Sequence, residues 1–304
     1  MGKGLAQAFP AAREVFDEVD DALSEKLSRL IWDGAEADLT LTENAQPALM
    51  AVSLAALRVL EAEYGRAATV NEAAFAAGHS LGEYSALAAM GSLTVSDTAR
   101  LLRTRGKAMQ TAVPQGQGAM LALLGVDADV AEKVAAEAAG EDVCQVANDN
   151  APGQVVISGS KSAIDRAAAL ATDYGVRRAI PLTVSAPFHC LLMQPAADRM
   201  ADALREVKLK APLRPVIGNI TARPMTEPEE IRQRLVEQVT GVVRWRESMS
   251  YMAEQGVTTV FEVGAGKVLT GLARRIDARL DARNIGSFED VKAFGAWLNG
   301  RAAA

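Results

Sequence analysis

A serine set between glycines constrains this chain more than any other feature. Residues 78–82 read Gly-His-Ser-Leu-Gly and fit the Gly-x-Ser-x-Gly template, which places a serine at a sharp turn between a strand and a helix. Small apolar residues over 73–77 predict a buried strand before it, and 81–90 predict a helix that ends at Gly91. We expect both flanking glycines to let strand and helix cross closely. A plain glycine-rich turn fits the template too, but this context favours a nucleophile at Ser80.

The chain offers a nucleophilic serine almost no choice of base, because it has two histidines, His79 and His189. His79 adjoins Ser80 and cannot readily turn back onto its own neighbour. His189 is therefore the candidate base, since serine enzymes commonly assemble such partners from distant segments. A lone histidine is more often a hydrogen-bonded core residue, but the serine motif reverses that preference. Residues 185–190 contain no aspartate or glutamate that could be the third member of a catalytic triad, so a dyad is as plausible as a triad.

One arginine falls on the apolar side of a predicted helix. Arg105 is spaced four residues from both Leu101 and Met109. A guanidinium on a packed face needs a partner, because burial of an unpaired charge is costly. The sequence alone favours an internal salt bridge, and the alternative is a bound substrate carboxylate, which the planar fork of arginine matches.

Composition excludes several classes of protein. The formal net charge of -6 and the isoelectric point near 5.2 argue against nucleic acid as the principal partner. No run approaches the 18 or more apolar residues of a membrane span, and the N-terminus lacks a signal-peptide pattern, so we expect a cytoplasmic protein with no membrane partner. Cys144 and Cys190 belong to no Cys-x-x-Cys pair, which predicts two reduced buried thiols and no metal site. The 263–267 segment lacks the Ser or Thr of a phosphate loop, because Val268 follows its lysine.

The order of predicted elements indicates an α/β protein. Helices are expected over 11–30, 46–64 and 98–112, the last capped at Ser96-Asp97. Strand and helix patterns over 119–124, 129–139, 143–148, 154–158, 163–174 and 177–182 form a β-α-β-β-α-β unit. The α/β pattern then resumes with helices over 198–207 and 229–239 and extended segments over 216–219 and 258–263. We therefore expect a hydrolase-like large subdomain (1–114 and 185–304) with a largely parallel sheet, and an inserted ferredoxin-like small subdomain (115–184).

Several segments together resemble the malonyl-CoA:acyl carrier protein transacylase family. They are 78–87 (Gly-His-Ser-Leu-Gly-Glu-Tyr-Ser-Ala-Leu), 105–107 (Arg-Gly-Lys), 150–156 (Asn-Ala-Pro-Gly-Gln-Val-Val), 187–190 (Pro-Phe-His-Cys) and 262–269 (Glu-Val-Gly-Ala-Gly-Lys-Val-Leu). This ordered set runs over most of the 304 residues and is far more specific than the serine motif alone.

The resemblance implies a role for each site residue. Ser80 is expected to carry the acyl group, with His189 as general base and then acid. The backbone N–H of Leu81 is expected to hold the oxyanion. Gln238 matches the position whose backbone carbonyl orients the histidine in place of a triad acid, and Arg105 matches the residue that clamps the malonyl carboxylate.

Further residues are implied as substrate or partner contacts. Phe188 before the histidine favours malonyl over methylmalonyl. Asn150 is a candidate substrate-binding residue, although its segment, 148–153, is read more readily as a tight turn. Arg177 and Arg178 form a hypothetical docking patch for the acidic carrier protein.

The implied activity is ping-pong transfer of malonyl from malonyl-CoA to acyl carrier protein by a monomer that needs no cofactor, for fatty acid synthesis. A polyketide-pathway acyltransferase and an α/β esterase or thioesterase are the alternatives. Family members begin with a strand and a Gly-Gln-Gly-Ser-Gln loop that supplies a second oxyanion donor, whereas the printed chain begins with residues that match the sequence beyond that loop. We expect a version extended upstream to be more stable and more active.

Overall fold

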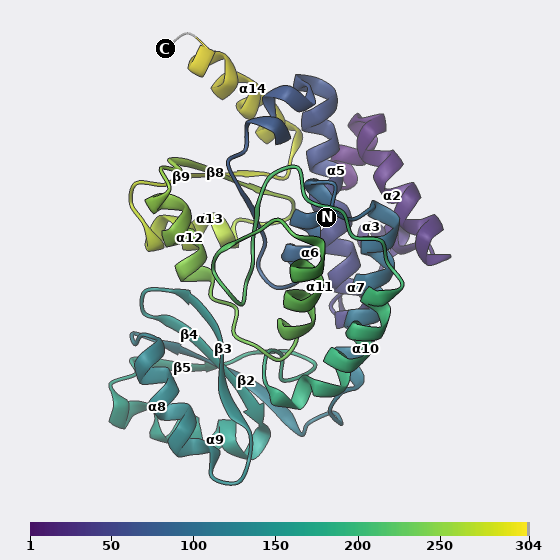
Figure 1. The fold of residues 1–304 in the computed structure, drawn as a ribbon. Helices are drawn as coiled ribbons and strands as arrows, with labels where there is room; N and C mark the ends of the chain where they lie inside the picture. The colour runs from purple at the N-terminus through teal and green to yellow at the C-terminus, as the bar shows by residue number, and fades with distance from the viewer. Residues whose placement is uncertain (303–304) are drawn as a thin grey trace.

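The computed structural model describes residues 1–302, which form a helical body joined to a smaller β-rich part (Figure 1). Helices of the body flank two small sheets. In chain order they are α1 (Lys3–Ala8), α2 (Pro10–Leu23), α3 (Leu27–Asp33), α4 (Glu36–Leu39), α5 (Thr42–Tyr64), α6 (Leu81–Ala89), α7 (Val95–Thr111), α10 (Gln194–Arg205), α11 (Pro228–Glu237), α12 (Trp245–Glu254), α13 (Val268–Ile276) and α14 (Phe288–Ala302).

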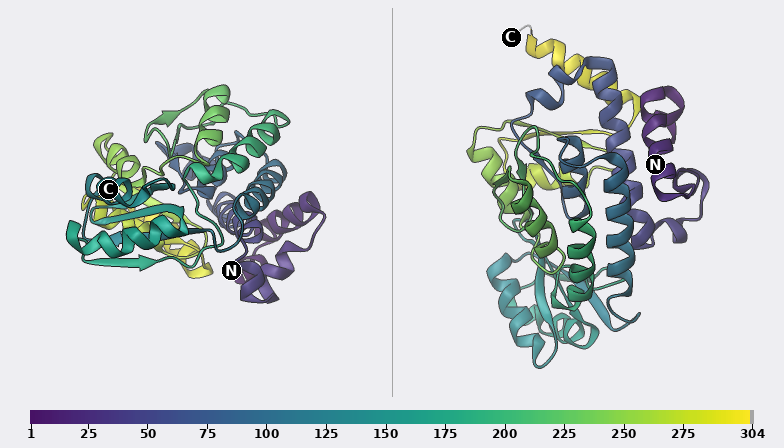
Figure 2. Two further views of the ribbon diagram at one scale, coloured as in Figure 1. Left: turned by 90° about the horizontal axis from the view of Figure 1, so that it is seen from below. Right: turned by 45° about the vertical axis from the view of Figure 1, so that its right-hand side comes forward.

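The central helices pack through apolar faces. α5 lies against α2, α6 and α7, and the long α5 and α7 run side by side in Figure 2. By length and composition α5 could cross a membrane, contrary to expectation, but 61% of its most apolar window is buried inside the protein. Contact with α2, α6 and α7 accounts for its apolar character, as in a core helix.

Strands of the body pair mostly in parallel, as predicted, but in two separate sheets. β1 (Ala76–Ala77) is parallel to β6 (Val216–Ile217), and β8 (Thr259–Val263) is parallel to β9 (Asp281–Ile285). β7 (Pro224–Met225) adds to β6 in the antiparallel sense. The strands beside the serine are shorter than predicted: β1 keeps only the last two residues of the predicted 73–77, and β6 ends before Gly218.

The smaller part has the β-α-β-β-α-β element order that the sequence predicted. Its strands are β2 (Gly118–Leu124), β3 (Cys144–Ala151), β4 (Gln154–Ser160) and β5 (Arg178–Pro181), in the antiparallel order β3-β4-β2-β5. Two helices, α8 (Ala128–Ala139) and α9 (Lys161–Leu170), cover one face (Figure 1). Leu121 and Leu123 of β2 face these helices, whereas Met120 and Ala122 face the body side with Phe188, as strand alternation requires.

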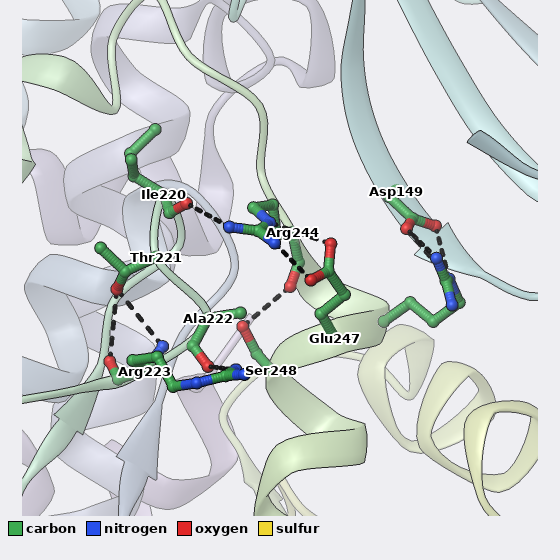
Figure 3. Close-up of polar contacts among 9 residues, drawn as sticks. Asp149, Ile220, Thr221, Ala222, Arg223, Arg244, Glu247 and Ser248 are labelled. Carbon is green, nitrogen blue, oxygen red and sulfur yellow. Dashed lines mark hydrogen bonds and ion pairs between the residues drawn. The ribbon is translucent and has the colours of Figure 1, made fainter. Parts of the chain in front are cut away.

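A short parallel bridge and an ion pair join the two parts. Val243 pairs with Asn148 of β3, and its N–H donates to the carbonyl of Ala147 at 2.9 Å. The guanidinium of Arg246 on α12 meets the buried carboxylate of Asp149, which is labelled in Figure 3, with Nη2–Oδ2 at 2.8 Å. These contacts fix β3 against the body next to the functional site.

Several predicted helix boundaries differ from the structure, and two of the differences have a clear physical cause. The predicted 11–30 helix is broken at Ser24, which adopts a left-handed φ of 52° between α2 and α3. α7 begins at Val95, and its cap is Thr94, whose hydroxyl accepts from the Asp97 N–H, so Ser96-Asp97 lie inside the helix. The Thr94 hydroxyl thus satisfies a backbone N–H of the first turn, a capping role that the sequence prediction gave to Ser96-Asp97.

Candidate active site

Ser80 lies at the turn between β1 and α6 in a strained backbone conformation, with φ 53° and ψ −110°. A Cβ atom at Gly78 would lie 1.9 Å from the carbonyl oxygen of Gly82, so the first glycine is required by the close crossing of strand and helix. A Cβ at Gly82 would meet nothing within 4 Å, so the expectation for the second glycine was wrong. The turn presents the serine hydroxyl at the start of α6.

Ser80, His189 and Gln238 form a hydrogen-bonded relay. Ser80 Oγ lies 2.8 Å from His189 Nε2, and His189 Nδ1 lies 2.9 Å from the backbone carbonyl of Gln238. A carbonyl oxygen only accepts, so the neutral imidazole carries its proton on Nδ1 and leaves Nε2 to accept from the serine. The structure thus supplies a base and a group that orients it, without a triad carboxylate at that position.

Burial keeps the imidazole neutral. His189 is 4% exposed, and burial together with the nearby positive charge of Arg105 lowers its pKa from 6.5 to about 3, against the opposing effect of the Gln238 carbonyl. The side chain is therefore a free proton acceptor at every pH well above 3.

Arg105 lies directly beside the nucleophile and is 1% exposed. Its guanidinium donates to Gln46 Oε1 at 2.7 Å, to Gln238 Oε1 at 2.9 Å and to Ser80 Oγ at 3.1 Å. Within residues 1–302 no carboxylate forms an ion pair with it, so the favoured expectation of an internal salt bridge was wrong. Neutral amides hold the guanidinium instead, and its buried Nε has no partner in that range. A buried cation beside a nucleophile is suited to bind an anionic acyl group.

Comparisons with known proteins identify the family. The acyl transferase domain family matches residues 1–284. A malonyl CoA-acyl carrier protein transacylase of Bacillus subtilis is 45% identical over 293 residues, which cover 96% of this chain and 90% of the relative. The chain belongs to the malonyl CoA-acyl carrier protein transacylase family. It is an acyltransferase with an α/β fold.

Solved structures of this transacylase family agree with the fold. An acyl-carrier-protein S-malonyltransferase from Bartonella henselae has a TM-score of 0.95 at 52% identity, covering 98% of this chain and 95% of that one. A malonyl-transacylase solved with a type II polyketide acyl carrier protein has a TM-score of 0.92 at 40% identity, covering 96% and 93%.

Besides Gln46, which accepts from Arg105, two further buried residues of the transacylase site were not predicted. Asn219, two residues after β6, accepts from Ser80 N–H through Oδ1 at 2.7 Å, and its Nδ2 donates to the Gly78 carbonyl at 2.8 Å. Glu83, on the first turn of α6, accepts from Gln238 Nε2 at 2.6 Å. The parallel pairing of β1 with β6 brings their carboxyl ends together, and an acidic residue three positions after the serine was the available signal for Glu83.

Asn150 and Phe188 each lie beside the catalytic pair: Asn150 contacts His79, which adjoins Ser80, and Phe188 precedes His189. Asn150 lies in β3, not in a turn, because β3 extends to Ala151 and the turn is confined to 152–153. Its Oδ1 lies 2.8 Å from Nε2 of His79. Burial lowers the pKa of His79, which packs against Trp245 at 5.6 Å between ring centroids. Phe188 is half-buried and contacts apolar residues of both the body and the small sheet.

Of the remaining predicted residues, Leu81 directly follows Ser80, whereas Arg177 and Arg178 line a groove that includes no residue of the site. Leu81 is the first residue of α6, and its N–H donates to no other group among residues 1–302. Arg177 and Arg178 are exposed and line a shallow groove with Arg275 on the open face of the small sheet.

Neither thiols nor metal ligands add to the site. Cys144 and Cys190 are free and buried, as predicted, and the Cys190 thiol donates to the Pro187 carbonyl at 3.2 Å. Over the described part of the chain no group of three or more His, Cys, Asp and Glu side chains is arranged to hold a metal ion.

Proposed function

We propose that this enzyme transfers a malonyl group from malonyl-CoA to the phosphopantetheine thiol of acyl carrier protein through a malonyl ester on Ser80. The observation that carries the proposal is the buried Arg105, whose guanidinium is 3.1 Å from the hydroxyl of Ser80. An uncharged ester or thioester substrate has no need for a buried cation at this place, whereas the malonyl carboxylate supplies the missing anion.

In the first half-reaction Ser80 Oγ attacks the thioester carbonyl carbon while its proton passes to His189 Nε2. The C–O bond forms, and the resulting oxyanion is stabilised by the free N–H of Leu81 at the start of α6. The C–S bond then breaks, and the CoA thiolate takes the proton from His189 as it leaves. Malonyl remains as an ester on Ser80.

The second half-reaction runs these steps in reverse with a new thiol. The phosphopantetheine thiol of the carrier protein gives its proton to His189 and attacks the ester carbonyl. The bond to Ser80 Oγ breaks, and that oxygen recovers the proton from His189. Throughout, the Gln238 carbonyl holds Nδ1–H at 2.9 Å and so keeps Nε2 facing the reacting atoms. Every bond is accounted for by the two substrates, so the proposal includes no cofactor.

Mass spectrometry of the intact protein tests the function. Incubation with malonyl-CoA is expected to add one malonyl group to Ser80, and addition of holo acyl carrier protein is expected to remove it with the appearance of malonyl carrier protein. The Ser80→Ala variant is the control that remains unlabelled. Absence of an adduct on the native chain contradicts the proposal, and release of free malonate without transfer supports a thioesterase instead.

We further propose that residues 115–184 form a small subdomain inserted between 1–114 and 185–304, and that Arg177 and Arg178 on it receive the carrier protein. Support comes from the separate apolar cluster over 121–176 and from the exposure of both arginines. Replacing both arginines by glutamate is expected to slow transfer to the carrier protein and to spare loading from malonyl-CoA. Lys133→Glu, on α8 across the sheet, is the matched control. Equal effects on both half-reactions contradict this docking site.

Pathway, location and oligomeric state belong to the same proposal. We assign the enzyme to fatty acid synthesis in the cytoplasm as a monomer. The malonyl-transacylase solved with a polyketide carrier protein keeps polyketide synthesis as the second candidate. Transfer rates measured with a fatty acid and a polyketide carrier protein decide between these pathways, and light scattering at several concentrations tests the monomer.

A further inference from the structure

Glu83 is a buried carboxylate that the reaction steps above do not use. It is 1% exposed on the first turn of α6, three residues after the nucleophile. Its Oε2 accepts from Gln238 Nε2 at 2.6 Å and from the backbone N–H of Asn219 at 3.1 Å. Its Oε1 is buried and has no partner within residues 1–302. A carboxylate removed from water to this extent needs a compensating role in the structure around it.

The first effect of this carboxylate is on the side-chain amide of Gln238. The amide lies between Glu83, which as a carboxylate can only accept, and Arg105, which can only donate. Its Nε2 therefore faces Glu83, and its Oε1 faces the guanidinium. The opposite orientation would place an amide N–H group against Arg105. The same residue supplies the backbone carbonyl that holds His189, so the position of Gln238 affects both the base and the cation.

The second effect is on Asn219, which holds the strained serine turn. Its side chain accepts from the N–H of Ser80 and donates to the carbonyl of Gly78. Glu83 Oε2 accepts from the backbone N–H of Asn219, and the backbone carbonyl of Asn219 accepts from the backbone N–H of Arg244 at 3.0 Å. The Arg244 side chain also donates to the backbone carbonyl of Ile220 and pairs with the Glu247 carboxylate, as Figure 3 shows. Asn219 is thus held from both sides.

We propose that Glu83 is a positioning residue for malonyl transfer, acting through Gln238 and Asn219 to keep Ser80, His189 and the carboxylate-binding face of Arg105 aligned. It touches no reacting atom. This inference rests on the proposed roles of Ser80 and Arg105.

The Glu83→Gln variant keeps the size of the side chain and removes its charge. A glutamine can offer either an oxygen or an N–H group to Gln238, so the orientation of that amide against Arg105 is no longer fixed. Malonyl loading of Ser80 is expected to fall about 10- to 100-fold, the usual scale for losing a supporting hydrogen bond or misplacing a group by ~1 Å. Acetyl loading needs no carboxylate-binding face and is expected to fall less, so the malonyl-to-acetyl ratio drops.

Single-turnover loading with malonyl-CoA and acetyl-CoA, read by intact-protein mass spectrometry, measures this ratio. Glu262→Gln is the matched control, because Glu262 is a carboxylate that caps α13 through the N–H groups of Leu269 and Thr270 and bonds to no residue of the site. It is expected to lower the melting temperature and to leave the ratio unchanged. If Glu83→Gln lowers both loading rates equally, or neither, the inference is overturned. Failure of the native enzyme to load malonyl instead overturns the proposed function.

The native enzyme provides a test that needs no variant. Burial raises the pKa of Glu83 from 4.5 to about 7, although Gln238, Asn219 and the charge of Arg105 oppose the shift. The charged or titratable groups facing it are Arg105 from α7 and Tyr84 from α6. As pH falls through about 7, Glu83 takes up a proton, and its charge-assisted hydrogen bonds weaken. The malonyl-to-acetyl ratio should fall in this interval, where His189 does not titrate, and a constant ratio refutes the inference.

Discussion

Replacement of Arg105 by alanine separates the recognition of the acyl carboxylate from the chemistry at Ser80. The guanidinium is fully buried and makes three hydrogen bonds, two of them to the side-chain amides of Gln46 and Gln238. In the proposed complex it binds the malonyl carboxylate with two charge-assisted hydrogen bonds, each worth about 1.5–3 kcal/mol. Their loss therefore removes about 3–6 kcal/mol of transition-state stabilisation. At 1.4 kcal/mol per tenfold, the rate of malonyl loading falls roughly 100- to 10,000-fold. We expect the smaller loss, about 100-fold, because the guanidinium must give up hydrogen bonds to the amides when it binds the carboxylate.

Acetyl loading provides the internal reference. An acetyl group has no carboxylate, so Arg105→Ala removes no bond to it, and the ratio of malonyl to acetyl loading is expected to fall about 100-fold. The assay is single-turnover acylation of Ser80 by each thioester, followed by intact-protein mass spectrometry. Arg100→Ala is the matched control, because Arg100 lies on the same helix and is exposed in an i,i+3 pair with Asp97.

Stability must be measured in parallel. Truncation leaves Gln46 Oε1 and Gln238 Oε1 without a donor, at a cost of about 1–3 kcal/mol each. This loss is partly offset because a buried cation is removed as well. A folded Arg105→Ala protein that loads malonyl at the native rate, or loses malonyl and acetyl loading to the same extent, would refute the reasoning.

Three further outcomes are expected. Ser80→Gly and Ser80→Ala should both abolish acylation, but the glycine variant should melt at the higher temperature, because φ 53° with ψ −110° strains any residue with a Cβ; equal melting temperatures would argue against stored strain. In Glu83→Gln, acetyl loading should stay constant as the pH falls to about one unit above the His189 pKa of about 3. At lower pH the loading rate should decline, because a protonated imidazole cannot accept the serine proton. A decline near pH 6.5 would instead show that the pKa of this histidine is not shifted. Asp149→Asn should lower the free energy of unfolding by about 1–3 kcal/mol in urea titration, because the buried carboxylate accepts from Arg246; an unchanged midpoint would mean that this ion pair does not stabilise the joint.

Much of the site could be predicted from the sequence, because its main signals are local. The glycines around Ser80, the scarcity of histidines and the four-residue spacing of Leu101, Arg105 and Met109 need only the geometry of a turn and a helix. The three α7 residues are indeed all buried on one face. The element order of the small sheet was similarly local, because each strand and helix is patterned within its own segment.

What the sequence by itself determined was thus the type of each element and the chemistry that it carries. The partner of Arg105 was predicted wrongly, because spacing places a side chain on a buried face but does not say which groups from other segments meet it there. Asn219 reaches Ser80 across 139 positions of sequence through the parallel pairing of β1 with β6, and Gln238 reaches Glu83 across 155. Only the tertiary structure decided these contacts, because strand order and helix packing, not sequence distance, set which buried polar groups lie within 3 Å of one another.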